Sequence, residues 1–334
     1  MTPAADPARP FRWRDGERTI FFGHGAVTAG LEELGTGYTL LTTARGEDAA
    51  PALVAGAGAV HHVPAGRVDE VAAAIRAEVA GELLVALGGG RVVDVAKALA
   101  AADPPRRVCA VPTTLSGAEM TWLHRHASGV PAGTPRARPQ IVLNDPALSA
   151  SQPPEELAAS ALNALGHAVE APATTQANPV ATLAALEAAR LLSAGLEAPA
   201  QPDRDALALG ALLAGYAADS AWYGLHHVLS QTLVRVSGSG HGPVNAVLLP
   251  VTVAALAGRA PSAAAELDRA LGGDATARVA RLRARTGAER LRDLGVRRDL
   301  LAEAASAAAE RPELELTPPR ASEPEILGLY ESAW

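Results

Sequence analysis

The chain has 334 residues, of which 49% are hydrophobic and 19% are charged, so it is long enough for two domains with separate cores. Its formal net charge of -7 argues against a general nucleic-acid-binding protein, which would carry a basic face. Its single cysteine, Cys109, excludes an intrachain disulfide and any metal cluster built from cysteines.

The first residues, 1–13, contain two arginines and three prolines but no apolar core, so they do not read as a signal peptide. No apolar run later in the chain approaches the roughly 20 residues of a membrane span. We therefore expect a cytoplasmic protein that binds neither membranes nor nucleic acids.

From residue 19 to about residue 145, short apolar runs alternate with amphipathic stretches. The expected strands are 19–22, 38–42, 59–63, 83–87, 108–111 and 141–143, with helices such as 68–79 and 92–101 between them. This alternation predicts a mostly parallel sheet with helices on both faces and ligands at the carboxyl ends of the strands.

The pattern changes after Asp145, because Pro153 and Pro154 open a series of long alanine- and leucine-rich helical segments with almost no strand signal. Residues 237–240 (Ser-Gly-Ser-Gly) are expected to form a tight loop among them. The prediction is an α/β N-terminal domain, residues 1–148, and an all-α C-terminal domain, residues 149–334. A cleft between two such domains is the default place for a ligand.

Three consecutive glycines, Gly88, Gly89 and Gly90, separate the fourth apolar run from the helical stretch that follows it. Glycines let the backbone approach an anion closely, and the first turn of a helix offers unpaired N–H groups. The pyrophosphate of a dinucleotide would bind there. The alternative is an ordinary strand-to-helix turn, which is common in α/β proteins.

Residues 111–121 follow the next expected strand and place hydroxyl groups around a glycine. Thr113 and Thr114 belong to this segment. It can bind phosphate, ribose or carboxamide oxygens, or it can be a polar surface turn.

Histidines recur in the helical half at spacings that place them together. Asn163 and His167 stand four residues apart, as do His227 and Gln231, so each pair lies on one face of a helix. With His241, these residues could surround a divalent metal. The alternative is that each histidine is an ordinary packed or surface residue, which is more common for a single histidine.

Taken together, these segments resemble the group III iron-containing alcohol dehydrogenases over nearly the whole chain. The resemblance is carried by 22–26, the glycine run, Thr113-Thr114, Asn144-Asp145-Pro146, 224–227 and 245–250. Residues 159–171 are most similar to the maleylacetate reductases of that family. The resemblance implies the two-domain fold of dehydroquinate synthase, a Rossmann-like N-terminal domain, NAD(P)-dependent oxidoreductase activity and a homodimer.

The resemblance also implies a metal site formed by His167, His227 and His241, with Asn163 where the family's alcohol dehydrogenases have an aspartate. Losing the anionic ligand weakens the attraction for a hard cation such as Fe²⁺. Maleylacetate reductases carry the same asparagine and are taken to work without a metal. Three neutral imidazoles can still hold Zn²⁺, so both possibilities stay open.

The chain departs from the reductases near the expected reacting end. Gln231 stands where they have a histidine, Val234 and Arg235 stand where they have two glycines, and the surroundings of His241 also differ. Glutamine donates a hydrogen bond but does not shuttle a proton near neutral pH. Arg235 is either an anchor for a substrate carboxylate or a solvated residue at a helix end.

The resemblance assigns the cofactor contacts. Family members that require NAD keep an aspartate after the second strand, where this chain has Ala44 and Arg45. Without a carboxylate to repel a 2′-phosphate, NADPH is expected to be accepted beside NADH, or preferred. The remaining assignments are Gly88, Gly89, Gly90 and Asp94 to the pyrophosphate loop, Thr113 and Thr114 to the nicotinamide side, and Lys97 to steadying the helix.

The activity most strongly implied is reduction of the double bond of 2-maleylacetate to 3-oxoadipate in aromatic compound catabolism. His227 and His241 are the expected donor and proton source, oriented by Asn163 and His167. Three alternatives stay open: a metal-dependent dehydrogenase of an alcohol or aldehyde, a lyase like the sugar-phosphate cyclases with no net nicotinamide turnover, and a pathway protein that has lost redox activity. The substrate is expected to be a small keto acid or dicarboxylate.

Overall fold

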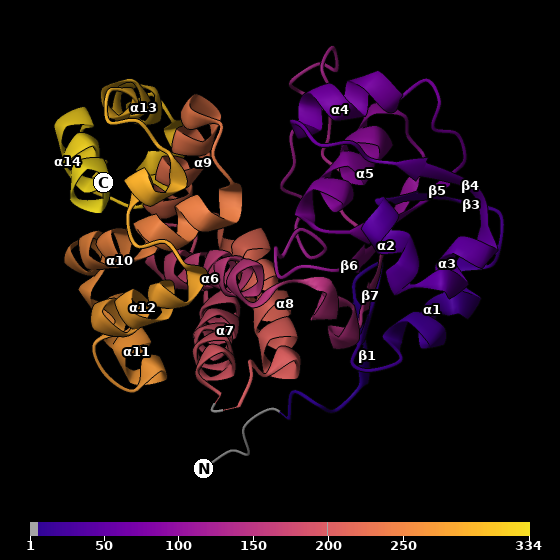
Figure 1. The fold of residues 1–334 in the computed structure, drawn as a ribbon, viewed down its shortest axis with the longest axis horizontal. Coiled ribbons are helices and arrows are strands. Elements are labelled where there is room, and N and C mark those ends of the chain that lie inside the picture. The colour runs from indigo at the N-terminus through magenta and orange to yellow at the C-terminus, as the bar shows by residue number, and fades with distance from the viewer. Residues whose placement is uncertain (1–5, 199) are drawn as a thin grey trace. The chain divides into compact units, whose positions relative to one another are not determined.

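The computed structural model describes residues 6–198 and 200–334, which divide into two compact units (Figure 1). The first runs to Gln152 and also includes Arg204–Leu209, and the second contains Pro153–Asp203 and Gly210–Trp334. The sequence-based division at residue 148 has a single boundary and does not describe the return of Arg204–Leu209 to the first unit.

The first unit contains a seven-stranded sheet in the order β1-β2-β7-β6-β5-β3-β4. β1 is antiparallel to β2, and every other neighbouring pair is parallel. This confirms the predicted α/β class. The strands are β1 (Phe11–Asp15), β2 (Arg18–Phe22), β3 (Tyr38–Thr42), β4 (Ala57–His62), β5 (Leu83–Gly88), β6 (Arg107–Pro112) and β7 (Ile141–Asn144).

Six of these strands lie where the apolar runs predict them. The sequence does not reveal β1, whose residues Phe-Arg-Trp-Arg-Asp are mostly exposed at the edge of the sheet. An edge strand with one open side does not need the continuous apolar run that marks a strand buried on both faces.

Apolar clusters cover both faces of the sheet, and alternate residues of β5 enter opposite clusters. Leu84 and Ala86 pack with α4 and α5, whereas Val85 and Leu87 pack with residues of α1 and α3. The predicted helix 68–79 ends early, at Ile75. The helices of this unit are α1 (Ala26–Leu34), α2 (Ala44–Ala49), α3 (Pro51–Gly56), α4 (Val68–Ile75) and α5 (Gly90–Ala102), followed by the 3-10 turn η1 (Pro146–Ser151).

The regular elements that the structure describes in the second unit are all helical, as predicted. The expected loop at 237–240 lies between the end of α9 and the start of α10. The α-helices are α6 (Pro154–Glu170), α7 (Pro179–Glu197), α8 (Arg204–Ala221, which begins in the first unit), α9 (Leu225–Ser237), α10 (His241–Arg259), α11 (Pro261–Leu271), α12 (Ala275–Arg283), α13 (Leu300–Ala309) and α14 (Glu323–Ala333). The 3-10 turns are η2 (Ala171–Ala173), η3 (Ala284–Thr286), η4 (Leu291–Leu294) and η5 (Pro312–Leu316).

Two of these helices, α7 and α10, are long and apolar enough to cross a membrane by length and composition. This corrects the expectation that no run of the chain approaches that length. Alanine-rich helices reach it without a conspicuous block of large apolar residues. Of the most apolar window of each helix, 50% and 56% respectively is buried within the protein, which is how core helices behave.

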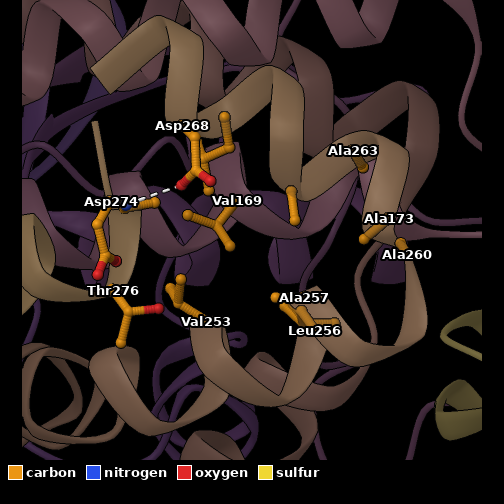
Figure 2. Close-up of a pocket in the computed structure, with 13 residues that line it drawn as sticks. Val169, Ala173, Val253, Leu256, Ala257, Ala260, Ala263, Asp268, Asp274 and Thr276 are labelled. Carbon is orange, nitrogen blue, oxygen red and sulfur yellow. Dashed lines mark hydrogen bonds between the residues drawn. The ribbon is translucent and has the colours of Figure 1, made fainter. Parts of the chain in front are cut away.

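A pocket of about 180 Å³ lies among α6, α10, α11 and α12 (Figure 2). Val169 and Val253 are among the apolar residues that line it. The carboxylates at its edge cap the start of α12, because Asp268 accepts from the Ala275 N–H at 2.8 Å and Asp274 is the N-cap residue. The residues that line this pocket include none of those predicted to form the site.

Candidate active site

The predicted nucleotide contacts gather around one pocket of the first unit, with a volume of about 260 Å³. It lies where β3, β5 and β6 end, and the carboxyl end of a parallel sheet is where such folds bind ligands. The lining residues are Thr43, Arg45, Gly46, Gly89, Gly90, Arg91, Val92, Thr113, Thr114 and Ser151.

The glycine run leaves no room for side chains. A Cβ on Gly89 would lie 3.0 Å from Thr114 Cγ2, and a Cβ on Gly90 would lie 2.9 Å from both Cβ and Oγ of Ser116. The loop after β6 therefore packs directly against the start of α5. The first turn of α5 lines the pocket, and the start of a helix is suited to bind a phosphate.

Lys97 supports this pocket from behind instead of lining it. Its side chain is fully buried, and its ammonium donates to the carbonyls of Ala118, Thr121 and Leu123 at 2.9, 3.1 and 2.7 Å. It also forms an ion pair with Asp94 at 2.8 Å. Lys97 and Asp94 thus fix the loop that packs on the glycines, and neither is among the residues that line the pocket.

The pocket carries positive charge without negative charge among its lining residues. Arg45 is the second residue of α2, and Arg91 is the second residue of α5; both are exposed. Ala44, also exposed, stands at the start of α2. Arg45 is a predicted cofactor contact and Arg91 is not, although an arginine directly after a glycine run is a readable signal for a phosphate site.

The predicted residues of the helical half lie on three helices of the second unit. α6 carries Asn163 and His167, α9 carries His227 and Gln231, and α10 begins at His241. The His167 and His227 rings stack, with centroids 3.8 Å apart and planes inclined by 11°. The His241 side chain is exposed, but its charge would act on both stacked histidines, so it lies close to them.

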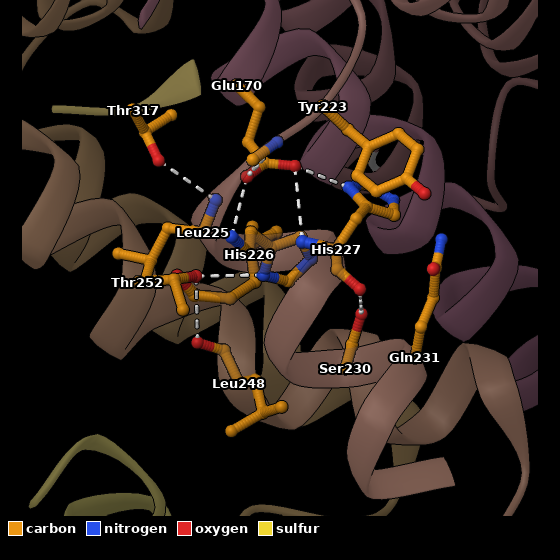
Figure 3. A network of polar contacts seen from close by, with 12 residues as sticks. Glu170, Tyr223, Leu225, His226, His227, Ser230, Gln231, Leu248, Thr252 and Thr317 are labelled. Atoms are coloured by element: carbon orange, nitrogen blue, oxygen red, sulfur yellow. Dashed lines mark hydrogen bonds and ion pairs between the residues drawn. The ribbon is translucent and has the colours of Figure 1, made fainter. Parts of the chain in front are cut away.

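Glu170, the last residue of α6, organises the start of α9 (Figure 3). Gly224, which precedes α9, offers no capping side chain. The fully buried Glu170 carboxylate instead accepts hydrogen bonds from the N–H groups of Gly224 (3.2 Å), His226 (2.5 Å) and His227 (3.2 Å). These donors are the ones a helix start leaves unpaired, and a negative charge there is favourable.

Glu170 also sets the protonation of His227. Its Oε2 lies 2.6 Å from His227 Nδ1, so Nδ1 carries the hydrogen and Nε2 is left as an acceptor. Burial, with a smaller effect from His241, lowers the pKa of His227 to about 3. His227 is therefore neutral at pH 7 and has no proton on Nε2 to give.

The neighbouring histidines are neutral for the same reason. Burial lowers the pKa of His226 to about 3 and the pKa of His167 well below its ordinary value. His226 Nδ1 lies 2.8 Å from Thr252 Oγ1, which donates its own hydrogen to a carbonyl of its helix. Burial raises the pKa of Glu170, while the charge of a protonated His226 and the backbone N–H donors act in the opposite direction.

Several buried acceptors in this cluster lack hydrogen-bond partners among the described residues. They include Nε2 of His226 and His227, Nδ1 of His167 and Oδ1 of Asn163. Buried polar atoms are almost always paired, with protein, water or ligand. These atoms therefore mark the part of the helical unit that is suited to a polar ligand.

The same cluster does not fit Fe²⁺ or Zn²⁺ as it is arranged. An imidazole binds a metal through a lone pair in its ring plane, and the nearly parallel planes of His167 and His227 do not aim two lone pairs at one tetrahedral ion. The Glu170 carboxylate is committed to His227 and to the start of α9. Among the described residues, no group of three His, Cys, Asp or Glu side chains has a metal-binding arrangement.

Gln231 contacts a second polar cluster that the sequence analysis overlooks. Arg311 Nη2 lies 3.4 Å from Gln231 Oε1 and 3.2 Å from Tyr223 Oη. Glu313 holds the same guanidinium at two points, with Nε–Oε2 at 2.9 Å and Nη2–Oε1 at 2.8 Å. The Tyr223 ring lies 5.9 Å from the His227 ring, so this cluster adjoins the histidines.

Both members of the Arg311–Glu313 pair are charged at neutral pH. Burial is the largest single effect on the pKa of Arg311 and acts to lower it, but the hydrogen bonds and charges of Glu313 and Tyr223 together outweigh it and the pKa is raised. Burial is likewise the largest single effect on the pKa of Glu313 and acts to raise it, but the hydrogen bonds to the carboxylate and the charge of Arg311 together outweigh it and the pKa is lowered. Arg235, the other candidate anchor, is exposed in the last turn of α9 and donates to Thr232 Oγ1 at 3.4 Å.

Tyr223 reaches this cluster through a turn between α8 and α9. Trp222 has φ 62°, and among the described residues it is the one non-glycine with positive φ. This conformation is costly for an aromatic residue and is found where the surroundings enforce it. Stacking of Trp222 on Tyr223, with centroids 5.5 Å apart, accompanies the turn.

Comparison with known sequences gives a consistent relationship. Residues 157–334 match the C-terminal domain of the Fe-containing alcohol dehydrogenase family. Over 316 residues the chain is 35% identical to the maleylacetate reductase of Sphingobium indicum, covering 88% of this chain and 89% of that protein. It is also 35% identical to maleylacetate reductase 1 of Rhodococcus opacus, covering 83% and 79%.

Solved structures agree over both units. Maleylacetate reductase from Agrobacterium tumefaciens has a TM-score of 0.81 at 29% identity and covers 98% of each chain. An iron-containing alcohol dehydrogenase from Corynebacterium glutamicum has a TM-score of 0.83 at 28% identity and covers 94% of each chain. The chain therefore belongs to the Fe-containing alcohol dehydrogenase family and is an NAD(P)-dependent oxidoreductase.

Proposed function

We propose that this protein reduces the carbon–carbon double bond of 2-maleylacetate to give 3-oxoadipate, using NADPH or NADH. The observation that carries the proposal is the stacked, neutral pair His167 and His227 beside Asn163, a set that does not fit a metal. Reduction of a double bond conjugated to a ketone can proceed without a Lewis acid, because a hydrogen-bond donor elsewhere in the site can stabilise the enolate. Relatives named maleylacetate reductases match most of the chain and support the same activity.

The bound nicotinamide supplies the hydride. As hydride adds to the alkene carbon, the electron pair moves onto the ketone oxygen, and the resulting enolate takes up one proton at carbon. In this proposal His241 provides that proton. His227, held by Glu170, accepts a hydrogen bond through Nε2 and orients the substrate or a water, and Asn163 orients the neighbouring His167.

We further propose that the enzyme acts in the cytoplasm as a homodimer and accepts NADPH at least as well as NADH. The phosphate-facing pocket supports the cofactor choice, because Arg45 and Arg91 line it and no carboxylate does. A 2′-phosphate adds further negative charge to the dinucleotide, and arginine is the residue that binds phosphate with a two-point contact.

The decisive experiment measures NADPH oxidation by the purified, chelator-treated protein with 2-maleylacetate. Rapid turnover supports both the activity and its independence from metal. Absence of turnover, followed by activity on aldehydes after addition of Zn²⁺ or Fe²⁺, would replace the proposal with a metal-dependent dehydrogenase. Dinucleotide binding without net NADPH oxidation would favour the lyase alternative.

Replacing Ala44 with aspartate tests the cofactor proposal. The new carboxylate, at the start of α2, would repel a 2′-phosphate and accept hydrogen bonds from a ribose. We expect the ratio of kcat/KM for NADPH to that for NADH to fall about tenfold or more, which corresponds to about 1.4 kcal/mol. Ala55→Asp is the matched control, because Ala55 is exposed on α3 and does not line the pocket. An unchanged ratio in Ala44→Asp would reject this assignment.

A further inference from the structure

At position 231 this chain has a glutamine where the related reductases have a histidine, which can shuttle protons. The amide group of Gln231 is instead held in one orientation. The guanidinium of Arg311 has donors and no acceptor, so the amide atom of Gln231 that faces it at 3.4 Å is the oxygen. The NH₂ group is consequently turned away from Arg311. Among the described residues, the hydrogen bond from Arg311 is the one recorded for the Gln231 side chain.

The position of Gln231 places its side chain beside the candidate site. Gln231 follows His227 by four residues on α9, so both lie on one face of the helix. Arg311 also bonds Tyr223, whose ring neighbours that of His227. In Figure 3 the Gln231 side chain extends from α9 toward Tyr223.

Arg311 is itself held rigidly. Glu313 binds it at two points, both side chains are only about one-fifth exposed, and both groups are charged at neutral pH. A guanidinium compensated by a carboxylate is a poor anchor for a second carboxylate. The same guanidinium is well suited to fix the orientation of an amide, because its geometry is planar and its position is set by Glu313.

We propose that Arg311 is a positioning residue that turns the Gln231 NH₂ group toward the substrate, so that Gln231 donates a hydrogen bond to an anionic oxygen of a keto acid or dicarboxylate. This inference rests on the proposed function for its substrate class. Gln231 then stabilises the enolate or a carboxylate oxygen without giving up a proton. The donor that the reaction requires is thus a neutral amide, and proton transfer falls to another group.

The first test replaces Gln231 with glutamate. The carboxylate keeps the size of the side chain and still accepts from Arg311, but it has no donor at neutral pH and repels an anionic substrate. We expect kcat/KM for 2-maleylacetate to fall about 100-fold, as for loss of an oxyanion donor. The loss should appear in both kcat and KM, because the enolate loses a donor and a charged substrate is repelled before reaction, and the thermal midpoint should stay at the wild-type value.

The second test separates positioning from direct action through a double-mutant cycle. Arg311→Met should lower kcat/KM about tenfold in the wild-type background and have no further effect in a Gln231→Ala background. Equal effects in both backgrounds would overturn the proposal, because Arg311 would then act independently of Gln231. Arg297→Met is the matched control: Arg297 pairs with Asp299 two residues later, as Arg311 pairs with Glu313, but among the described residues no contact joins it to Gln231 or Arg311.

Binding of maleate, measured by calorimetry with NADP⁺ present, gives a readout that does not depend on turnover. We expect Gln231→Glu and Arg311→Met to weaken maleate binding and Arg297→Met to leave it unchanged. Coupled loss of maleate binding in a protein that fails to reduce 2-maleylacetate would keep this inference while rejecting the proposed reaction. A wild-type protein that binds no maleate, or a Gln231→Glu variant that binds it normally, would overturn the inference.

Discussion

The two units build their candidate sites in opposite ways. In the first unit, the pocket at the glycine run includes the backbone of Gly89 and Gly90, and the buried Lys97 ammonium behind it is paired with three carbonyls and Asp94. In the second unit, the site is built from side chains of separate helices, and several buried polar atoms have no partner among the described residues. The buried cation of the first site thus has its partners within the protein, whereas the open polar atoms of the second are placed to bind a ligand.

This difference predicts how each site fails. A backbone pocket depends on whatever fixes the backbone, so a single buried cation can control it. A site built from side chains depends on the close packing of its helices. Substitutions are therefore expected to damage it most at positions where a small residue on one helix lets another helix approach. The following predictions test this contrast, from the largest expected effect to the smallest.

The largest effect is expected at Lys97, the only lysine in the sequence. Lys97→Met leaves the carbonyls of Ala118, Thr121 and Leu123 and the Asp94 carboxylate without their buried partner. We expect the free energy of unfolding to fall by about 3–5 kcal/mol, as for breaking a buried ion pair from one side. Urea denaturation measures this, and calorimetry should show NADPH binding lost with it.

An exposed pair in the same unit provides the control. Arg76 also binds a carboxylate, that of Asp103, and a carbonyl, that of Ala102, but its side chain is 38% exposed. Arg76→Met should lower the free energy of unfolding by less than about 1 kcal/mol. If the two variants lose similar amounts, the claim that burial gives Lys97 its importance fails.

The next effect is expected at Gly166, where α6 makes room for α9. A Cβ there would lie 2.6 Å from His226 Nε2 and 3.3 Å from His227 Cε1. Although alanine is the better helix former, we expect Gly166→Ala to lower the free energy of unfolding by about 1–3 kcal/mol, because a packed ring must move. We also expect kcat to fall, because His227 moves with it.

The same substitution at Gly258 places the new methyl group in an open environment. It lies within α10, is exposed, and has nothing within 4 Å of a built Cβ. Gly258→Ala should raise the free energy of unfolding by about 0.5 kcal/mol through helix propensity alone. Effects of the same sign in Gly166→Ala and Gly258→Ala would show that close helix approach is not what matters at Gly166.

The two sites also differ in how much of each can be predicted from the sequence. Gly88, Gly89 and Gly90 are consecutive, follow a buried strand and precede a helix, so a local pattern reveals both the fold and the pocket. Glu170 and Gly224 are 54 residues apart and meet through the packing of two helices, which no local pattern contains. The motif around His167 includes Glu170, but its role depends on where α9 begins.

Arg311 shows the limit most clearly. It lies between α13 and η5, 80 residues after Gln231, in a stretch with no motif of its own. Its contact with Gln231 depends on the turn at Trp222 and on the pairing with Glu313. The sequence identifies Gln231 as a departure from the family. That Arg311 contacts Gln231 can be seen only in the tertiary structure.

The smallest effect is a difference in pH dependence, and it tests whether the histidines of the second unit are held neutral. The folded-state pKa of His226, about 3, lies below the value of about 6.5 that it has when unfolded, so stability is retained above pH 6.5 and lost as the pH falls toward 3. The titratable groups that act on it are His167, Glu170, His227 and His241. His226→Gln removes one such group.

Between pH 6 and pH 4.5, the slope of unfolding free energy against pH should be shallower in His226→Gln than in the wild type by about 1.4 kcal/mol per pH unit. Thr252→Val is the control, because it removes the hydrogen bond to His226 Nδ1 and keeps the titrating ring. That variant should lose stability at every pH with the slope retained. Parallel curves for wild type and His226→Gln would mean that His226 takes up a proton in the folded protein, and the open acceptors of the second unit would then have to be explained by a charged histidine cluster instead of a neutral one.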